Sequence, residues 1–223
     1  MVIKSTSYSN NEIINNILEL HNDGNSIDCD CCYSKGVFYK DGTVEQPRLK
    51  FDISPQTEDT VQADCRNLPL ENNSIHCMMF DPPFVIGVGK SLLGDDDSQC
   101  KTQKRFSGFS NVEELISFYY DSLVELYRVI EDNGVLIFKC QDTVSCGTNF
   151  FSHIYISEIA QYLGFYLKDL FVLNSKTRII SGKVVNQQHA RKFHSYFLVF
   201  TKNKKKLNVV KSKIYDFLID SFF

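Results

Sequence analysis

The fold of this 223-residue chain is decided by one stretch, Ile75-His76-Cys77-Met78-Met79-Phe80-Asp81-Pro82-Pro83-Phe84. Its first six residues are mostly apolar, which predicts a buried strand. Pro82 and Pro83 fix φ and stiffen the turn that follows. The stretch therefore predicts a buried strand whose C-terminal end presents a carboxylate, Asp81, and an aromatic ring, Phe84.

An acid, two prolines and an aromatic ring at a strand end suit chemistry on the exocyclic amine of a nucleobase. That nitrogen is a poor nucleophile, because its lone pair is delocalised into the ring. Asp81 and the Pro82 carbonyl can accept hydrogen bonds from the two N–H groups of this amine, and Phe84 can stack on a base flipped out of its helix. The simpler alternative is a strand that ends in a proline-rich loop with a partly buried Phe84.

Strand and helix patterns alternate on both sides of this stretch, without an internal repeat. Apolar periodicity after the capping boxes Ser9/Glu12 and Ser110/Glu113 predicts a helix over 10–22 and a second helix that ends at Asn133-Gly134. A third helix is expected over 152–163. Strands are expected at 26–30, 48–53, 59–63, 75–80, 135–138, 165–173 and 194–201.

Strands that alternate with helices indicate an α/β fold with a mostly parallel sheet and covered faces. The last two strands are joined without an obvious helix, which predicts an antiparallel hairpin at the edge. We expect one domain over 1–201, composed of the helix 10–22 and a core 26–201. The remaining residues, 202–223, are predicted to form a lysine-rich tail.

The composition is ordinary for a soluble globular protein, with 43% hydrophobic and 23% charged residues. No apolar stretch reaches the roughly 18 residues that span a bilayer, and no charged-then-apolar leader opens the chain. The eight cysteines lack the spacing of a disulfide framework, and Cys29, Cys31 and Cys32 with His21 match no common zinc pattern. A cytoplasmic protein with reduced thiols, no metal and no membrane contact is expected.

Charge is distributed unevenly along the chain. Residues 1–169 hold 13 basic and 25 acidic side chains, whereas residues 170–215 hold 11 basic and no acidic ones. This segregation predicts a face for a polyanion such as a phosphate backbone, although a solvated lysine-rich tail explains Lys202 to Lys206 equally well. The candidate nucleic-acid contacts between the last two strands are Lys176, Arg178, Lys183, His189, Arg191 and Lys192.

Acidic residues follow several of the predicted strands. In open α/β sheets, ligands bind outside the carboxyl ends of the strands, where Asp30, Asp52, Asp64 and Asp81 are expected. Each of them alone is compatible with a turn or helix-cap role. Together they favour a binding site in which Asp52 contacts ribose hydroxyls and Asp64 contacts the amine of an adenine.

These motifs together resemble the class I S-adenosylmethionine-dependent methyltransferases that methylate DNA at an amino group, including small phage and bacterial members. Asp81-Pro82-Pro83-Phe84 is similar to their catalytic motif of Asp, Asn or Ser, then Pro-Pro, then an aromatic residue. Residues 30–36, 51–53 and 64–69 resemble the cofactor loop, the ribose-binding strand end and the adenine-binding segment. The likeness spans roughly 26–201 and includes 135–142 and 188–200.

The resemblance implies a Rossmann-like class I methyltransferase fold, S-adenosyl-L-methionine as the cofactor and base flipping. It implies that Asp81, Pro82, Pro83 and Phe84 are catalytic and that the cofactor is bound by Asp30, Tyr33, Ser34, Gly36, Asp52, Asp64 and Cys65. DNA is favoured over RNA, and by analogy adenine N6 is favoured over cytosine N4. The alternatives are an RNA base methyltransferase and a non-catalytic, methyltransferase-like nucleic-acid-binding subunit.

Two departures from the family pattern concern the cofactor loop. Ser34 replaces the first loop glycine, and the 15 residues between Gly36 and Asp52 are too few for the helix that normally follows the loop. We therefore expect weak intrinsic cofactor affinity. The sequence leaves a partner subunit or a homodimer open.

Overall fold

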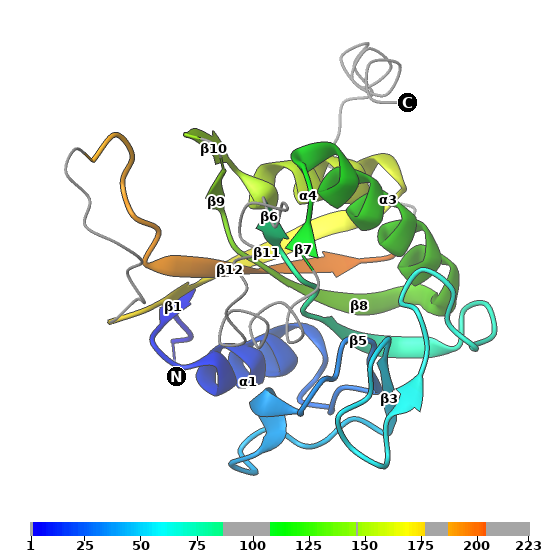
Figure 1. The fold of residues 1–223 in the computed structure, drawn as a ribbon. Coiled ribbons are helices and arrows are strands. Elements are labelled where there is room, and N and C mark those ends of the chain that lie inside the picture. The colour runs from blue at the N-terminus through cyan, green and yellow to red at the C-terminus, as the bar shows by residue number, and fades with distance from the viewer. Residues whose placement is uncertain (1, 87–107, 146, 177–186, 204–223) are drawn as a thin grey trace.

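The structure is a computed structural model that describes residues 2–86, 108–145, 147–176 and 187–203. Eight strands form one sheet (Figure 1). In spatial order they are β1 (Thr6–Ser7), β11 (Tyr166–Asn174), β12 (His194–Thr201), β8 (Ile130–Cys140), β5 (Ile75–Phe80), β2 (Cys29–Asp30), β3 (Leu49–Asp52) and β4 (Val61–Gln62).

The sheet is mostly parallel. From β4 to β8 each strand is parallel to its neighbours, and β12 is antiparallel to both β8 and β11. The short β1 pairs in parallel with the outer side of β11. This arrangement confirms the predicted α/β class with an antiparallel pair towards one edge, and β1 extends that edge by two residues.

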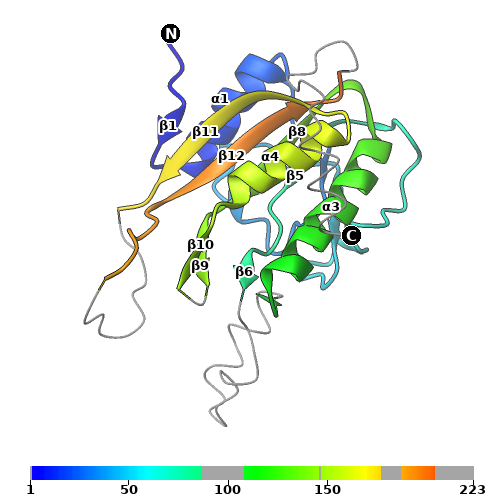
Figure 2. The ribbon, with the colours of Figure 1, turned by 90° about the horizontal axis from the view of Figure 1, so that it is seen from above.

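Helices cover both faces of the sheet. Figure 2 shows α3 (Val112–Val129) and α4 (Ser152–Tyr162) on one face, with α1 (Asn10–His21) behind the other. The side chains of β5 alternate accordingly: Met78 and Phe80 pack with α3 and α4, whereas Cys77 and Met79 pack with α1. Because both faces are buried, the strand is almost continuously apolar, and its bounds agree with the predicted 75–80.

The Ser9 N-cap of α1 is confirmed, since its side chain accepts a hydrogen bond from the Glu12 backbone N–H. The reciprocal half of the predicted capping box is not formed, because the Ser9 N–H donates to Ser7 Oγ and the Glu12 carboxylate accepts from the Ser7 hydroxyl. The box predicted for α3 is displaced by one residue. Asn111 is the N-cap and accepts from the Glu114 N–H, while the Glu114 carboxylate accepts from the Ser110 N–H. An asparagine caps as well as a serine does, so the two registers are hard to distinguish by sequence.

The prediction that Asn133-Gly134 ends the second helix is wrong. The helix ends at Val129, and β8 begins at Ile130 with extended backbone. Asn133 has a φ of 68°, and a Cβ on Gly134 would lie 2.8 Å from the His76 carbonyl oxygen. The pair therefore forms an irregularity inside β8, where the register with β5 shifts.

The connections around the sheet are short. Only a 3-10 helix, η1 (Val37–Tyr39), lies between β2 and β3, as the 15-residue spacing predicts. Two short strand pairs were not predicted, because two or three residues carry too little pattern. They are β6 (Val85–Ile86) with β7 (Gly108–Phe109), and β9 (Thr143–Ser145) with β10 (Thr148–Phe150).

Among the described residues, no helix is long and apolar enough to cross a bilayer. In the same residues, no group of three His, Cys, Asp or Glu side chains is arranged to hold a metal ion. Arg178, Lys183 and most of the predicted tail lie outside the described ranges.

Candidate active site

The acidic residues predicted from the strand pattern are placed along one edge of the sheet. Asp30 and Asp52 are the last residues of β2 and β3, Asp81 directly follows β5, and Asp64 lies two residues beyond β4. These four strands are parallel, so their carboxyl ends share an edge. The edge is therefore the candidate ligand-binding side of the molecule.

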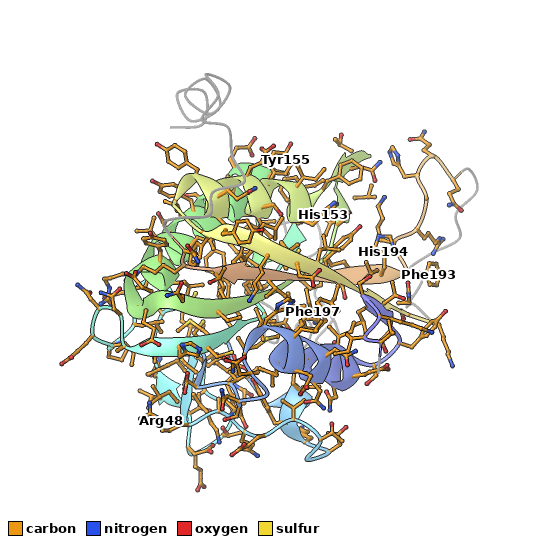
Figure 3. All side chains as sticks on the ribbon, turned by 180° about the vertical axis from the view of Figure 1, so that it is seen from behind. Arg48, His153, Tyr155, Phe193, His194 and Phe197 are labelled. Atoms are coloured by element: carbon orange, nitrogen blue, oxygen red, sulfur yellow. The ribbon has the colours of Figure 1, made fainter. Side chains whose placement is uncertain are left out.

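The Asp81 carboxylate contacts the ammonium group of Lys139, a residue of β8 that was not predicted as part of the site. Lys139 Nζ lies 3.1 Å from Asp81 Oδ2 and 3.3 Å from Oδ1. The same Nζ lies over the rings of Phe38 and Phe197, 5.2 and 6.0 Å from their centroids; Figure 3 labels Phe197 on β12. A single lysine in the otherwise apolar run 135–140 was the available signal.

Strand register explains this contact. Phe80 pairs with Phe138, so the next residues along the two parallel strands are Asp81 and Lys139. Both Nζ–O distances exceed the 2.7–2.9 Å that is usual for charge-assisted bonds. A carboxylate offers about four lone-pair sites. Asp81 can therefore accept hydrogen bonds from another donor while it keeps its contact with Lys139.

The residues after Asp81 continue the site. Pro82 is buried, and Pro83 and Phe84 are half-buried immediately before β6. Phe84 is therefore partly accessible three residues along the chain from Asp81, whose side chain is itself 25% exposed. The arrangement can bind a flat group that carries N–H donors.

Asp30 is buried and bonded within the protein. Its carboxylate accepts hydrogen bonds from the Cys32 backbone N–H at 3.0 Å and from the Tyr39 hydroxyl at 2.8 Å. Burial raises the pKa of Asp30 to about 7, and the charges of Asp81 and Asp52 act in the same direction. Asp30 thus anchors the loop that follows β2.

That loop, residues 31–36, is closed by Asp52 and by two tyrosines. Asp52 Oδ2 accepts from the Ser34 N–H and Oδ1 from the Ser54 N–H, both at 2.8 Å. The Tyr33 ring stacks on the Tyr39 ring at 5.5 Å and lies over Gly36, where an added Cβ would be 2.4 Å from the tyrosine oxygen. Gly36, with a φ of 61°, is therefore required for the closed loop.

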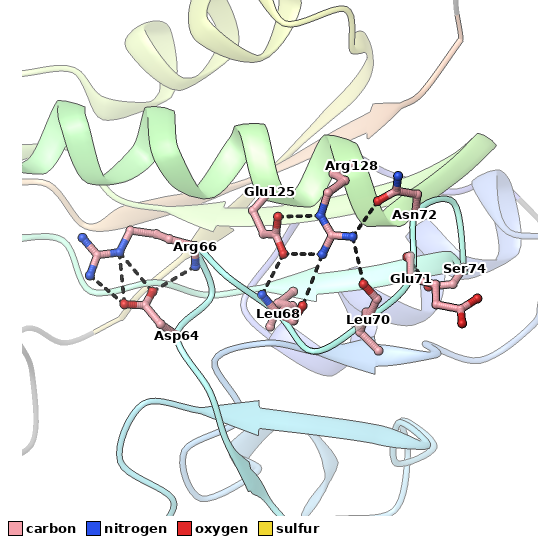
Figure 4. Close-up of polar contacts among 9 residues, drawn as sticks. All are labelled: Asp64, Arg66, Leu68, Leu70, Glu71, Asn72, Ser74, Glu125 and Arg128. Carbon is pink, nitrogen blue, oxygen red and sulfur yellow. Dashed lines mark hydrogen bonds and ion pairs between the residues drawn. The ribbon is translucent and has the colours of Figure 1, made fainter.

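Asp64 and Cys65 belong to a different local structure. Asp64 forms a fork with Arg66, whose hydrogen bonds lower the pKa of the carboxyl (Figure 4). The Cys65 side chain is buried, with its Sγ 3.6 Å from Ser122 Oγ on α3. Any contact between Cys65 and a cofactor must therefore use its backbone.

A second ion pair, also missed from the sequence, fixes this segment to α3. Glu125 accepts from the Leu68 N–H at 2.7 Å and from Arg128 at 2.6 Å, while Arg128 donates to the carbonyls of Leu68 and Leu70 (Figure 4). Burial would raise the pKa of Glu125, but the hydrogen bonds from Arg128 and Leu68 hold it below its usual range. The pair positions the chain that leads into β5.

Four of the six candidate nucleic-acid contacts are described. Lys176 lies over the Tyr8 ring at 5.4 Å, and Lys192 lies over the Phe151 ring at 5.2 Å. His189 Nε2 donates to the Gly147 carbonyl at 2.6 Å, which joins the β9–β10 hairpin to the segment that contains Arg191 and Lys192. That segment leads directly into β12. Arg178 and Lys183 lie outside the described residues.

A cluster beside the carboxyl end of β8 was also missed. Asp142 is only 2% exposed and accepts from His153 Nδ1 at 2.7 Å and from the Tyr196 hydroxyl at 3.3 Å. Burial, followed by the charge of Asp142, raises the pKa of Tyr196 to about 12. Residues 142, 153 and 196 are so far apart in the chain that no spacing rule connects them.

Known structures with a similar fold differ in activity. A candidate DNA modification methylase from Thermus thermophilus, complexed with S-adenosyl-L-methionine, is 15% identical over 63% of this chain and 51% of its own, with a TM-score of 0.42. TrmN, also from Thermus thermophilus, is 13% identical over 88% of this chain and 50% of its own (TM-score 0.48). This chain thus spans about half the length of either protein.

The [4+2]-cyclase SpnF is 12% identical, with a TM-score of 0.51 over 86% of this chain and 81% of its own. A cyclase with this fold illustrates that the fold alone does not define the reaction. Among curated proteins, none has a matching sequence.

A family model provides the assignment. The model described as DNA methylase, for the N6/N4 methyltransferases, matches residues 75–219, which is well over half of the chain. The match begins at β5 and so includes Asp81-Pro82-Pro83-Phe84. The chain therefore belongs to the N6/N4 DNA methylase family of S-adenosyl-L-methionine-dependent methyltransferases.

Proposed function

We propose that this chain transfers a methyl group to an exocyclic amino group of a nucleobase, with adenine N6 in DNA as the favoured target. The observation that carries the proposal is the position of Asp81. It follows the central strand β5, keeps free acceptor capacity and is followed by two prolines and a half-buried aromatic ring. We also propose that residues 1–201 act as one methyltransferase domain.

In this proposal the chain prepares the amine for attack. Asp81 and the Pro82 carbonyl accept hydrogen bonds from the two N–H groups of the amine, which shifts the nitrogen towards a tetrahedral geometry with its lone pair available. Asp81 also stabilises the positive charge that develops on the nitrogen as the new N–C bond forms. Phe84 stacks on the base and excludes water from one face. When bound, S-adenosyl-L-methionine supplies the methyl group.

Asp52, at the end of β3, fits the cofactor in kind. Each Asp52 oxygen accepts one backbone N–H, so each keeps a lone pair for a ribose hydroxyl. Asp64 lies further along the same edge, where it would face the adenine. The loop that contains Tyr33, Ser34 and Gly36 makes its contacts within the protein. This supports a weak intrinsic affinity for the methionine moiety of S-adenosyl-L-methionine.

The test is nucleoside analysis by mass spectrometry after incubation of the purified protein with S-adenosyl-L-methionine and DNA or RNA. N6-methyladenine in DNA is the expected product. N4-methylcytosine would move the target to cytosine, and methylation of RNA alone would favour the RNA enzyme. Absence of methylation from every nucleic acid tested would contradict the proposal.

A non-catalytic nucleic-acid-binding subunit is the second candidate function. The observation that favours it is the internal bonding of Asp30 and of the loop 31–36. A ligand that binds only the folded state raises the melting temperature. An unchanged Tm at millimolar S-adenosyl-L-methionine, together with retained nucleic-acid binding, would support this candidate over the enzyme.

A further inference from the structure

Four aromatic or imidazole rings follow one another along the edge that carries Asp81. The Phe151 ring meets His153 edge-on at 6.4 Å, His153 stacks on Tyr196 at 4.2 Å, and His194 meets Tyr196 edge-on at 5.2 Å. We name these residues the aromatic row. Phe151 is the N-cap of α4 and His153 lies in its first turn, while His194 and Tyr196 are the first and third residues of β12; Figure 3 labels His153 and His194.

The aromatic row lies at the border of the hydrophobic core, against which Tyr196 packs partly buried. Phe151 is 40% exposed and the His153 side chain is 22% exposed, whereas Tyr119 and Phe138 in the core are fully buried. The adjacent Phe193 is 38% exposed. Phe151 and His153 therefore remain partly accessible to a ligand.

The middle of the row is held rigidly. Asp142, at 2% exposure, fixes the His153 ring through Nδ1 and the Tyr196 ring through its hydroxyl. Burying a carboxylate to orient two partly exposed rings is costly unless its hydrogen bonds are complete. Rings that are already oriented lose little conformational entropy when a planar group stacks on them.

The surroundings of the row suit an anionic ligand. Lys192 lies over the Phe151 ring at 5.2 Å, and Arg191 precedes it. The Asp142 oxygens face His153 and Tyr196, so their charge is turned inward. Residues 170–215 contain no acidic side chain. Rings combined with cations are the recognised means of binding unpaired nucleotides, whose bases stack while their phosphates pair with the cations.

The row also lies close to the methylation motif. Tyr196 of β12 pairs with Cys140 of β8, and β8 pairs with β5, which leads into Asp81. Two strand spacings, about 10 Å, therefore separate the backbone at Tyr196 from the line of β5, with Tyr196 packed on the α3/α4 side of the sheet and Lys139, the partner of Asp81, over Phe197 on the α1 side. If the target base of a nucleic-acid strand is bound at Asp81, the neighbouring nucleotides of that strand lie along this edge of the sheet.

We propose that the aromatic row is a stacking subsite for an unpaired base adjacent to the base that is methylated. This inference rests on the proposed function for the position of the target base. It extends that function to the form of the substrate: at least two neighbouring bases of one strand are unpaired when the strand is bound.

The test measures the affinity of the full chain for two single-stranded DNA probes by fluorescence anisotropy. One probe carries bases, and the other has the same length and phosphates but only abasic sites. Their affinity ratio reports base contacts independently of charge and of the target sequence. Phe151→Leu keeps apolar surface without the ring, and His153→Gln keeps a donor for Asp142 without the ring.

Wild type should prefer the base-bearing probe, and each variant should lower that preference about tenfold, the usual effect of losing one base–ring stack. Phe151→Tyr should retain the preference. Ile154→Ala, an exposed position on the same helix, is the matched control and should leave the ratio unchanged. Ratios within twofold of wild type for both variants, or equal losses on both probes, would overturn the inference.

The proposed function is tested separately, because the affinity ratio does not require methyl transfer. A ring-dependent ratio without any methylated product would retain the subsite and refute the enzyme. Methylated product together with an unchanged affinity ratio in both variants would support the enzyme and refute the stacking subsite.

Discussion

At the scale of single residues, the site depends on how charge is placed beside Asp81. Lys139 is held by two aromatic rings and contacts both oxygens of the Asp81 carboxylate. It therefore fixes the plane of the carboxylate that, in the proposed function, accepts hydrogen bonds from the amine. We regard Lys139 as a positioning residue, since it acts through Asp81.

Lys139→Met should lower kcat about 10- to 100-fold, the effect of losing a charge-assisted hydrogen bond of about 1.5–3 kcal/mol. KM and nucleic-acid affinity should stay within about twofold, because Lys139 does not contact the substrate in this account. Lys139→Arg should restore most of the activity. Lys168→Met, at an exposed position of β11, is the control. Steady-state kinetics that show a raised KM with unchanged kcat would assign Lys139 to binding instead.

Asp30 gives the protein a pH-dependent stability. Its folded-state pKa is about 7, whereas an unfolded aspartate has a pKa of about 3.9. Below about pH 4 both states are protonated and the carboxyl adds no pH dependence to the free energy of unfolding. Between about pH 4 and 7 only the folded state holds the proton, so the free energy of unfolding falls as pH rises, by up to about 1.4 kcal/mol per pH unit.

Asp30→Asn removes this titration. As the pH rises from about 5 to about 7, the free energy of unfolding of the variant should therefore increase relative to that of wild type. Above that range the difference between the two proteins should stay constant. Urea denaturation of both proteins at several pH values measures the difference in unfolding free energy. The contributions of the other titrating groups cancel in this difference. A difference that is independent of pH would show that Asp30 is ionised throughout.

At the scale of elements, one ion pair fastens the segment before β5 to α3. Glu125 and Arg128 together bond the backbone of Leu68 and Leu70. Glu125→Ala leaves the buried Leu68 N–H without its acceptor and the Arg128 guanidinium without its carboxylate partner, and should cost about 2–3 kcal/mol of unfolding free energy. Glu131→Ala breaks an exposed pair with His76 and should cost less than about 1 kcal/mol. Equal losses in chemical denaturation would contradict a positioning role for Glu125.

The elements were predictable wherever a pattern extends over enough residues. The β5 strand, the Ser9 cap of α1 and the α4 helix follow from apolar period and capping chemistry. Asn133-Gly134 misled the prediction, because the same dipeptide that ends helices also fits an irregular turn inside a strand. Contacts such as Asp81 with Lys139, or Asp142 with His153 and Tyr196, depend on the strand order, which no local pattern contains.

At the scale of the whole molecule, the sheet order places the acidic strand ends and the basic segment along one edge. Residues 187–193 lead into β12, whose start lies beside the carboxyl end of β8. The chain therefore has acidic residues at its strand ends and the basic residues Arg191 and Lys192 next to them, which the proposed function assigns to the reaction and to phosphates. The sequence predicted both groups, and the topology explains why they are neighbours.

Replacing Arg191 and Lys192 by glutamine should weaken binding to all duplex sequences alike. It should also flatten the dependence of log affinity on log salt by about 0.9 for each phosphate that the protein no longer neutralises. Binding titrations at several salt concentrations measure both effects. Lys4→Gln with Lys168→Gln removes the same charge elsewhere and should leave the slope unchanged. An unchanged slope for the first pair would mean that the basic segment is only solvated.

The central claim is that Asp81 prepares a base amine for methylation. Its most direct test compares wild type with Asp81→Ala for transfer of labelled methyl from S-adenosyl-L-methionine to DNA, with equal melting temperature as the measure of an intact fold. The account predicts N6-methyladenine with wild type and a loss of at least about a thousandfold with the variant, because no other described acceptor lies in its place. Transfer by Asp81→Ala within about tenfold of wild type would contradict it.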